Sequence, residues 1–207
     1  MQQTIEDIKK LIKKDYEQKI KTFQKITMEY HDVFIGDSMI SFFNLGHYGF
    51  NHAFNMGIPG DTTLGVLKRI HLLEPLHPKR VFLSVGSNDL VLTNHDIHTI
   101  IDHIITIKNM IDTFAKCYVL LITPVNPDDT KANHAYIAGR RNEDIITINE
   151  GIKQHLLTDV IDVYTPLIDD KKRLNVIYSK DGIHINYEGY KRYASVILEH
   201  IKASSEV

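Results

Sequence analysis

The sequence has few of the residues that mark several large classes of protein. Of its 207 residues one is cysteine, Cys117, and none is tryptophan. A single thiol excludes a fold stapled by disulfides and a zinc site built from cysteines. Lysine and arginine number 24 against 26 aspartates and glutamates, so the chain lacks the basic excess of nucleic-acid binders. We therefore expect no nucleic-acid partner.

Long apolar runs are also missing. The longest, residues 118–122, has the length of a buried strand, whereas a membrane span requires about 20 apolar residues. The first seven residues do not resemble the start of a secretory signal, because no apolar core follows. From the sequence we expect a cytoplasmic protein with no stable insertion into a membrane.

Apolar residues recur at steps of three or four between about residues 5 and 26, which predicts an amphipathic helix. Its apolar face would consist of Ile5, Ile8, Ile12, Tyr16, Ile20 and Phe23. Acidic residues are mixed with the lysines of the other face, so docking on the protein body or on a partner subunit is favoured over a membrane surface. We expect residues 1–30 to be a helical lead-in and 31–207 one folded domain, with a homodimer as an open possibility.

After this helix, short apolar runs alternate with helical patterns, which predicts an α/β fold with a parallel sheet and helices on both faces. The expected strands are residues 33–35, 53–55, 81–85, 118–123 and 160–163. The expected helices are residues 38–45, 62–73, 95–114, 142–157 and 187–203. The longest irregular stretch, residues 124–139, is of a length that is usually functional or mobile.

Ligands of such a sheet bind beyond the carboxyl ends of its strands, where this chain has polar turns. Gly36-Asp37-Ser38 follows the first strand and opens a helix, whose amino end favours negative charge near the serine hydroxyl. Residues 55–61 follow the second strand, and two glycines there allow a backbone N–H to face a ligand. Each turn also has a plain structural explanation as a helix cap or a tight loop.

Two further turns supply the remaining groups that acyl transfer needs. Asn88 follows the third strand, and its amide can donate a hydrogen bond to a developing oxyanion. Near the end of the chain, Asp181 stands three residues before His184, where a carboxylate can orient an imidazole. A capping aspartate beside an incidental histidine is the alternative. Nucleophile, oxyanion donors, base and orienting carboxylate together favour a catalytic site.

These turns resemble the motif blocks of the SGNH or GDSL hydrolases. The resemblance implies a flavodoxin-like three-layer αβα sandwich with a five-stranded parallel sheet. It also implies a catalytic triad of Ser38, Asp181 and His184. The oxyanion hole would consist of the backbone N–H groups of Ser38 and Gly60 and the side-chain amide of Asn88.

The lead-in helix and the ending Asp-Gly-Ile-His…Gly189-Tyr190 are similar to the bacterial branch that resembles platelet-activating-factor acetylhydrolase. Two residues depart from the common pattern. Met39 replaces the leucine of Gly-Asp-Ser-Leu, and Tyr178 lies near the place where many relatives carry a tryptophan before the Asp-x-x-His block. The second departure concerns the packing of the histidine loop and leaves the chemistry unchanged.

The sequence thus predicts a serine esterase that cleaves short acyl esters, acetyl esters foremost, through an acyl-serine and without a metal or other cofactor. Short acyl groups are expected because no apolar lid is evident. Contacts to this small-molecule acyl ester are expected from Asn126, Tyr136, Arg140 and Arg141. The alternatives are a carbohydrate O-deacetylase or a lysophospholipase on the same scaffold, or a binding module without catalysis.

Overall fold

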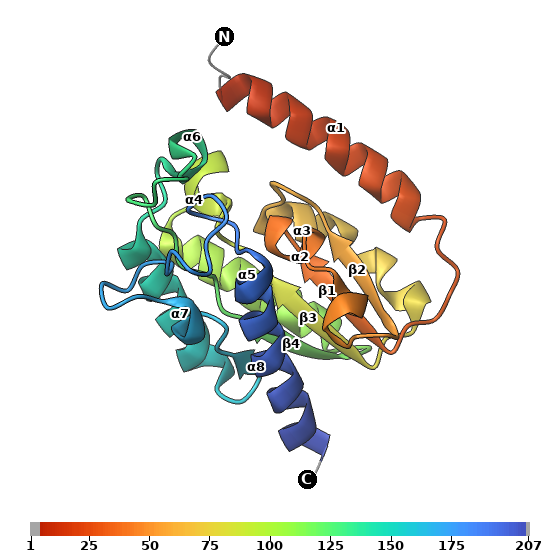
Figure 1. Cartoon of the computed structure of the whole chain (residues 1–207). Coiled ribbons are helices and arrows are strands. Elements are labelled where there is room, and N and C mark those ends of the chain that lie inside the picture. Colours follow the sequence, from red (N-terminus) through yellow and green to blue (C-terminus); the bar gives the residue numbers. More distant parts are fainter. Residues whose placement is uncertain (1–4, 206–207) are drawn as a thin grey trace.

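The computed structural model describes residues 5–205, with side chains from residue 10 to residue 204. Five strands form one all-parallel sheet in the order β2-β1-β3-β4-β5, which is the flavodoxin-like order. They are β1 Asp32–Gly36, β2 Ala53–Gly57, β3 Arg80–Ser84, β4 Lys116–Leu120 and β5 Val160–Ile161. Helices flank the sheet (Figure 1), so the predicted α/β class and parallel sheet are confirmed.

The eight α-helices of the described residues differ greatly in length. The long ones are α1 Ile5–Phe23, α5 Ile97–Ile111, α7 Asn142–Leu156 and α8 Tyr187–Ser205. The short ones are α2 Ser38–Ser41, α3 Thr63–Arg69, α4 Asp89–Leu92 and α6 His134–Ile137. Among residues 5–205, no helix is both long enough and apolar enough to cross a membrane.

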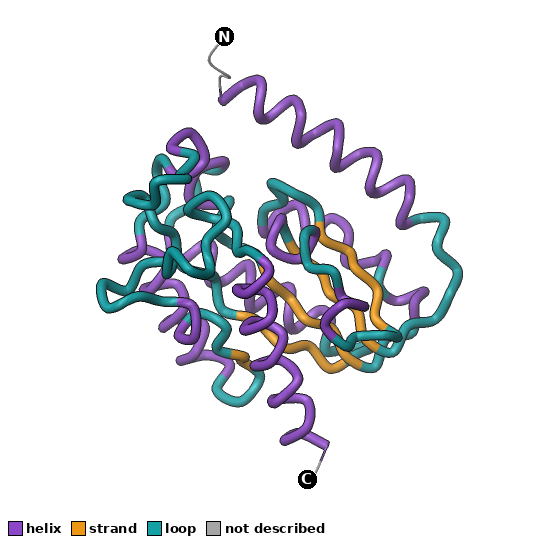
Figure 2. The backbone as a smooth tube through the Cα atoms, viewed as in Figure 1, coloured by secondary structure: helices purple, strands orange, loops and turns teal. Residues whose placement is uncertain are grey.

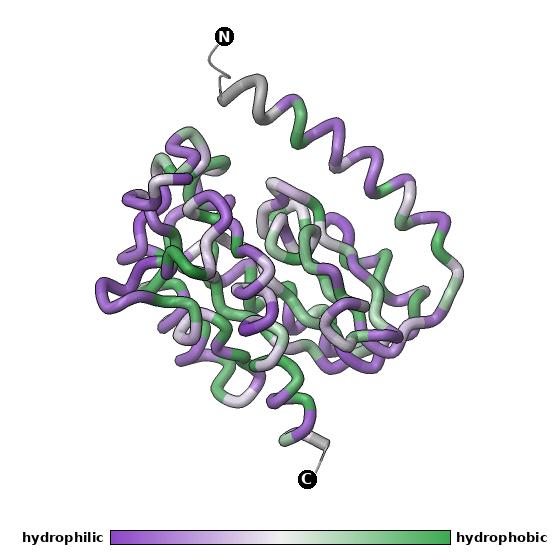
Figure 3. Tube along the Cα trace, viewed as in Figure 1, coloured by the Kyte–Doolittle hydropathy of each residue, from purple (hydrophilic) through white to green (hydrophobic). Residues whose placement is uncertain are grey.

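Successive residues of each strand point to opposite faces of the sheet, and this alternation builds two cores. Val33 and Ile35 of β1 face the core that α3, α5 and α7 cover, whereas Phe34 faces the core beneath α2 and α8. The hydrophobic residues lie accordingly along the strands (Figure 3), and the buried residues of the helices pack against them. Cys117 of β4 is fully buried in the core.

Several predicted boundaries were wrong for local reasons. The predicted helix 62–73 ends at Arg69 and continues as two 3-10 turns, Ile70–Leu72 and Glu74–Leu76, because Pro75 cannot extend an α-helix. The predicted strand 118–123 is instead β4, which ends at Leu120. Its neighbour β5 is only two residues long and pairs with β4 no further than Leu120. An apolar run marks burial more reliably than it marks strand pairing.

Helix α1 lies along the outside of the molecule, with its amino end directed toward α4 and α6 (Figure 1). Its carboxyl half packs against the body: Phe23 is buried and meets the ring of Phe54 edge-on at 6.0 Å, and Ile20 contacts the same core. The Tyr16 hydroxyl donates to the backbone oxygen of Gly65 at 2.9 Å. The predicted apolar positions Ile5 and Ile8 lie outside the described side chains.

Candidate active site

The polar turns predicted from the sequence meet at one end of the sheet. Because the strands are parallel, the turns after β1, β2 and β3 emerge at the same edge, and loops surround this end of the molecule (Figure 2). They border a cavity of about 440 Å³ whose lining includes Ser38, Gly60, Asn88 and His184. This volume is typical of small-molecule sites.

A chain of two hydrogen bonds joins the residues predicted as a triad. The Ser38 hydroxyl lies 3.1 Å from Nε2 of His184, and Nδ1 of the same ring lies 2.7 Å from Oδ2 of Asp181. These distances are those of a nucleophile, a base and a carboxylate that orients the base. The structure therefore brings together three side chains that are up to 146 residues apart in sequence.

The Asp181 carboxylate is fixed from two sides. Its Oδ1 accepts hydrogen bonds from the backbone N–H groups of Ile183 and His184, at 3.1 and 2.8 Å. Partial burial raises the pKa of Asp181, but the hydrogen bonds from His184 and from the backbone outweigh burial and hold the pKa below its usual value. Asp181 is thus ionised at neutral pH, as a group that stabilises an imidazolium must be.

The imidazole ring is supported by an aromatic side chain. The ring of Phe42 lies edge-on to His184, with centroids 5.1 Å apart. Tyr178, the predicted neighbour of the histidine loop, instead packs against the core beneath α2 and α8, and its backbone oxygen accepts from Asn186. Phe42 therefore provides the packing on the histidine ring.

Ser38 is the first residue of α2, where backbone N–H groups have no partner within the helix. The preceding Asp37 is the N-cap: its side chain accepts from the N–H of Met39 at 2.9 Å. Asp37 is almost completely buried, and burial raises its pKa to about 7. The turn thus keeps the serine hydroxyl at the cavity while the carboxylate beside it serves the helix end.

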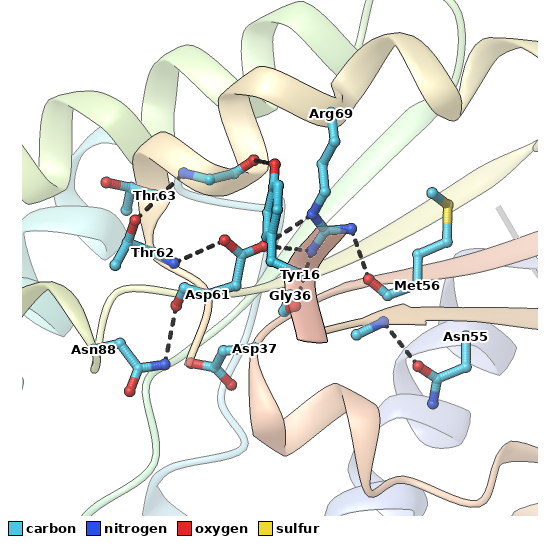
Figure 4. Close-up of polar contacts among 12 residues, drawn as sticks. Tyr16, Gly36, Asp37, Asn55, Met56, Asp61, Thr62, Thr63, Arg69 and Asn88 are labelled. Atoms are coloured by element: carbon cyan, nitrogen blue, oxygen red, sulfur yellow. Dashed lines mark hydrogen bonds and ion pairs between the residues drawn. The ribbon is translucent and has the colours of Figure 1, made fainter. Parts of the chain in front are cut away.

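The loop that carries Gly60 is held by a buried ion pair that the sequence analysis missed. Arg69 of α3 donates from Nε to Asp61 at 2.8 Å, and its other nitrogens donate to the backbone oxygens of Met56 and Gly36 (Figure 4). One guanidinium thereby ties the ends of β1 and β2 to the loop between β2 and α3. An arginine on the buried face of a predicted helix was the available signal.

Gly60 has a left-handed backbone, with φ of 77°, that a glycine adopts without strain. Within the described part of the chain its N–H has no hydrogen-bond partner, so it is available to a ligand in the cavity. Thr62 caps the helix that follows, because its hydroxyl oxygen accepts a hydrogen bond from the N–H of Gly65.

The Asn88 side chain is held at both of its ends. Its Nδ2 donates to the backbone oxygen of Asp61 at 2.9 Å (Figure 4), and its Oδ1 accepts from Arg140 at 2.6 Å. An amide nitrogen carries two hydrogens, so one remains for a group in the cavity. Arg140 also donates to the Ser87 hydroxyl and to the backbone oxygen of Tyr136. Burial lowers the pKa of Arg140 to about 10, and the nearby Asp37 opposes this shift.

Of the four residues predicted to contact substrate, Tyr136 and Arg140 line the cavity and two do not. Asn126 is buried away from it: its amide donates to Leu174 O at 2.8 Å, and its backbone N–H donates to Gly182 O at 2.7 Å. It therefore braces the loop of His184 from behind. Arg141 is exposed and faces acidic neighbours at the start of α7. The structure thus places neither side chain on the cavity wall, because a loop sequence does not indicate which side chains turn inward.

One group of described side chains has the composition of a metal site. Asp89, His95 and His103 place their ligand atoms within 4.8 Å of one another. Both oxygens of Asp89, however, accept hydrogen bonds from Thr63, whose hydroxyl also lies 2.9 Å from Nδ1 of His103. The cluster therefore anchors the first turn of α3 by hydrogen bonds. The sequence has eleven histidines besides His184, and their spacing did not predict that His95 and His103 lie close together.

The fold is similar to that of several solved structures. A protein of Streptococcus pneumoniae named for platelet activating factor is 22% identical, with a TM-score of 0.79 over 95% of this chain and 97% of its own. A GDSL-like lipase of Bacteroides thetaiotaomicron is 17% identical, with a TM-score of 0.78 over 92% and 98%. The lipase/acylhydrolase of Enterococcus faecalis is 20% identical, with a TM-score of 0.65 over 86% and 97%.

Comparison with curated proteins found no match. The sequence profile of the GDSL-like lipase/acylhydrolase family, in contrast, matches residues 34–192, a span that contains the turns described above. This span covers more than half of the chain and reaches from β1 into α8. The chain belongs to the GDSL-like lipase/acylhydrolase family of hydrolases.

Proposed function

We propose that this hydrolase is a serine esterase that works through an acyl-serine intermediate. The observation that carries the proposal is the hydrogen-bonded series Ser38–His184–Asp181 at the wall of the cavity. Ser38 Oγ attacks the ester carbonyl carbon while His184 Nε2 takes the hydroxyl proton. The imidazolium that forms is stabilised by the ionised Asp181.

The negative charge that develops on the carbonyl oxygen needs hydrogen-bond donors that are already in position. We assign this role to the N–H groups of Ser38 and Gly60 and to the second Nδ2 hydrogen of Asn88. His184 then gives its proton to the leaving alkoxide, and the alcohol departs. Water, deprotonated by His184, attacks the acyl-serine, and the acid and the free serine are released.

The length of the acyl group and the identity of the alcohol group define the substrate more closely. The expectation from the sequence is that acetyl esters are the substrates. The largely apolar side chains of the cavity, among them Phe42, Leu90 and Val91, support acyl groups longer than acetyl. We therefore propose carboxylic esters as the class, with a lysophospholipid or an O-acetylated carbohydrate as the alternative to a simple ester.

The test is hydrolysis of p-nitrophenyl acetate and butyrate by the full chain, compared with the Ser38→Ala variant, together with labelling by a fluorophosphonate. The expected result is turnover and one adduct on Ser38 in the parent protein, and neither in the variant. Circular dichroism establishes that the variant is folded. A folded parent protein that gives neither turnover nor adduct would indicate the alternative of a binding module without catalysis.

A further inference from the structure

We propose that α1 is the roof of the acyl-binding site, and that Leu11 and Ile12 set the length of the acyl chain that is accepted. The proposal rests on the esterase function proposed above and names the side chains that select its substrate. The expected ligand is an ester of an unbranched saturated acid longer than acetic acid.

The first observation is the position of Ile12. A Cβ placed on Gly60 would lie 2.6 Å from two carbon atoms of the Ile12 side chain. Ile12 therefore rests directly on the glycine whose N–H is assigned to the oxyanion hole. Both Ile12 and Leu11 line the cavity, and the Leu11 side chain remains 57% exposed. A leucine that borders a cavity and is still half exposed is placed to bury its surface against a ligand.

The second observation is how α1 is attached. Tyr16, Ile20 and Phe23 hold its carboxyl half on the core, and Tyr16 lies beside Asp61 and Arg69 (Figure 4). Leu11 and Ile12 are four or five residues before Tyr16, about one helical turn beyond this anchor. The anchored carboxyl half of the helix thus fixes the position of Leu11 and Ile12 at the cavity. Lys13 and Lys14, on its outer side, are exposed.

The third observation is the distribution of polar and apolar groups in the cavity. Ser38, Asn88 and His184 supply polar groups to the lining, and α4 contributes the apolar side chains of Leu90 and Val91. A largely apolar cavity with a few polar groups beside the nucleophile suits a carbonyl group with an aliphatic tail. The sequence showed no obvious apolar lid, but in this proposal part of the apolar face of α1, at Leu11 and Ile12, covers the site.

Part of α1 has a counterpart in at least one of the comparison structures. The match to the S. pneumoniae protein extends over 95% of the chain. The unmatched 5% is shorter than the 19 residues of α1, so part of this helix has a counterpart there. The match to the E. faecalis enzyme covers 86% of this chain.

The experiment measures kcat/KM on p-nitrophenyl esters with acyl chains of two to twelve carbons. For the parent protein, kcat/KM is expected to rise from acetate to an intermediate length and then fall. Leu11→Ala and Ile12→Ala should lower the ratio of kcat/KM for the preferred ester to that for acetate by about tenfold each, because aliphatic contacts to the chain are lost. Leu11→Lys should lower it further. Lys13→Ala, on the outer side, is the matched control and should leave the profile unchanged.

A binding assay separates this proposal from the esterase function. The Ser38→Ala variant cannot form an acyl-enzyme, so binding of dansyl-undecanoic acid to it reports the chain site alone. Adding Leu11→Lys to Ser38→Ala should weaken this binding about tenfold, and adding Lys13→Ala should not. If the parent protein shows no turnover but the Ser38→Ala variant binds the probe in a way that depends on Leu11, the result counts against the esterase function and not against the role of α1. The role of α1 would be overturned if the Leu11 variants and the Lys13→Ala control had the same chain-length profile of kcat/KM. It would also be overturned if they bound dansyl-undecanoic acid equally tightly.

Discussion

The guanidinium of Arg140 donates a 2.6 Å hydrogen bond to Oδ1 of Asn88. Arginine has no acceptor, so the atom of Asn88 that faces it must be the carbonyl oxygen and the nitrogen must face the other way. That nitrogen donates to the backbone oxygen of Asp61. Arg140 therefore fixes the orientation of the Asn88 amide, and a residue predicted to bind substrate becomes a positioning residue for the proposed oxyanion donor.

This relationship predicts how the two residues are coupled. Asn88→Ala is expected to lower kcat on p-nitrophenyl acetate by 10²–10³, roughly the effect of losing one oxyanion donor. Arg140→Gln should lower kcat by about tenfold with KM little changed. The Asn88 amide would lose its fixed orientation, whereas substrate binding would not depend on Arg140. In the double variant the loss should be close to that of Asn88→Ala alone, because both changes remove the same interaction.

A rise in KM with constant kcat in Arg140→Gln would instead identify the arginine as a substrate contact. Fully additive losses in the double variant would show that the two side chains act independently. Arg141→Gln is the matched control. Its side chain is exposed and points away from the cavity, so both constants should stay at their parent values.

The Asp181–His184 hydrogen bond of 2.7 Å makes a prediction about the imidazole. Asp181→Asn keeps an oxygen for the two backbone N–H groups but can donate to Nδ1, which turns the ring to the unproductive tautomer. We expect kcat to fall by about 10⁴ with the fold intact, as is typical of this change in a triad. Steady-state kinetics and a thermal melt of the variant test it. A loss of less than tenfold would mean that His184 needs no carboxylate partner.

The buried Asp37 predicts a stability effect that depends on pH. Its pKa in the folded protein is raised to about 7 by burial, so the folded state keeps a proton that the unfolded chain loses near pH 4. Stability from this residue is therefore lost as pH rises from about 4 to 7, by about 1.4 kcal/mol for each unit. Asp37→Asn keeps an acceptor for Met39 N–H and removes the titration.

The measurement is urea denaturation of Asp37→Asn and the parent protein between pH 4 and 8. The variant should gain in unfolding free energy relative to the parent as pH rises to 7, with no further change above that value. Asp96→Asn serves as the comparison, since Asp96 is an exposed N-cap whose pKa is lowered by its hydrogen bonds to Thr99. A constant difference between Asp37→Asn and the parent at all pH values would contradict the raised pKa.

The Arg69–Asp61 pair predicts a strong effect on stability. Both side chains are almost fully buried, at 1% and 2% exposure. Arg69→Met would remove the donor to Oδ2 of the buried Asp61 and one donor to each of the backbone oxygens of Met56 and Gly36, and should lower the unfolding free energy by about 3–5 kcal/mol. Lys68→Met, one residue away on the exposed side of α3, is the control and should change it by less than about 0.5 kcal/mol. Equal melting curves for the two variants would refute this account.

The strands and the turns at their ends were predictable because each rests on short-range pattern. Apolar runs marked β1 and β3, and the polar residues that follow them proved to share one edge of a parallel sheet. Ser38 and His184 could be placed for the same reason, since a strand-to-turn step and an Asp-x-x-His spacing are local signals.

The supporting contacts were not predictable, because they join residues that no local pattern connects. Arg140 meets Asn88 across 52 residues of sequence, and the partner of Ile12 is a glycine in another turn. Periodicity assigned Ile12 to an apolar face but could not say what that face covers. The positions of Asn126 and Arg141 outside the cavity wall could not be predicted either, since the direction of each side chain depends on its neighbours in the fold.

Asp61 connects three parts of the site. Its backbone oxygen holds the amide of Asn88, its carboxylate holds Arg69, and its peptide nitrogen is bonded to the carbonyl carbon of Gly60. Asp61 therefore links two of the three proposed oxyanion donors, the Gly60 N–H and the Asn88 amide, which lie on different loops. A displacement of Asp61 would shift these two donors together relative to the third, the N–H of Ser38 on α2.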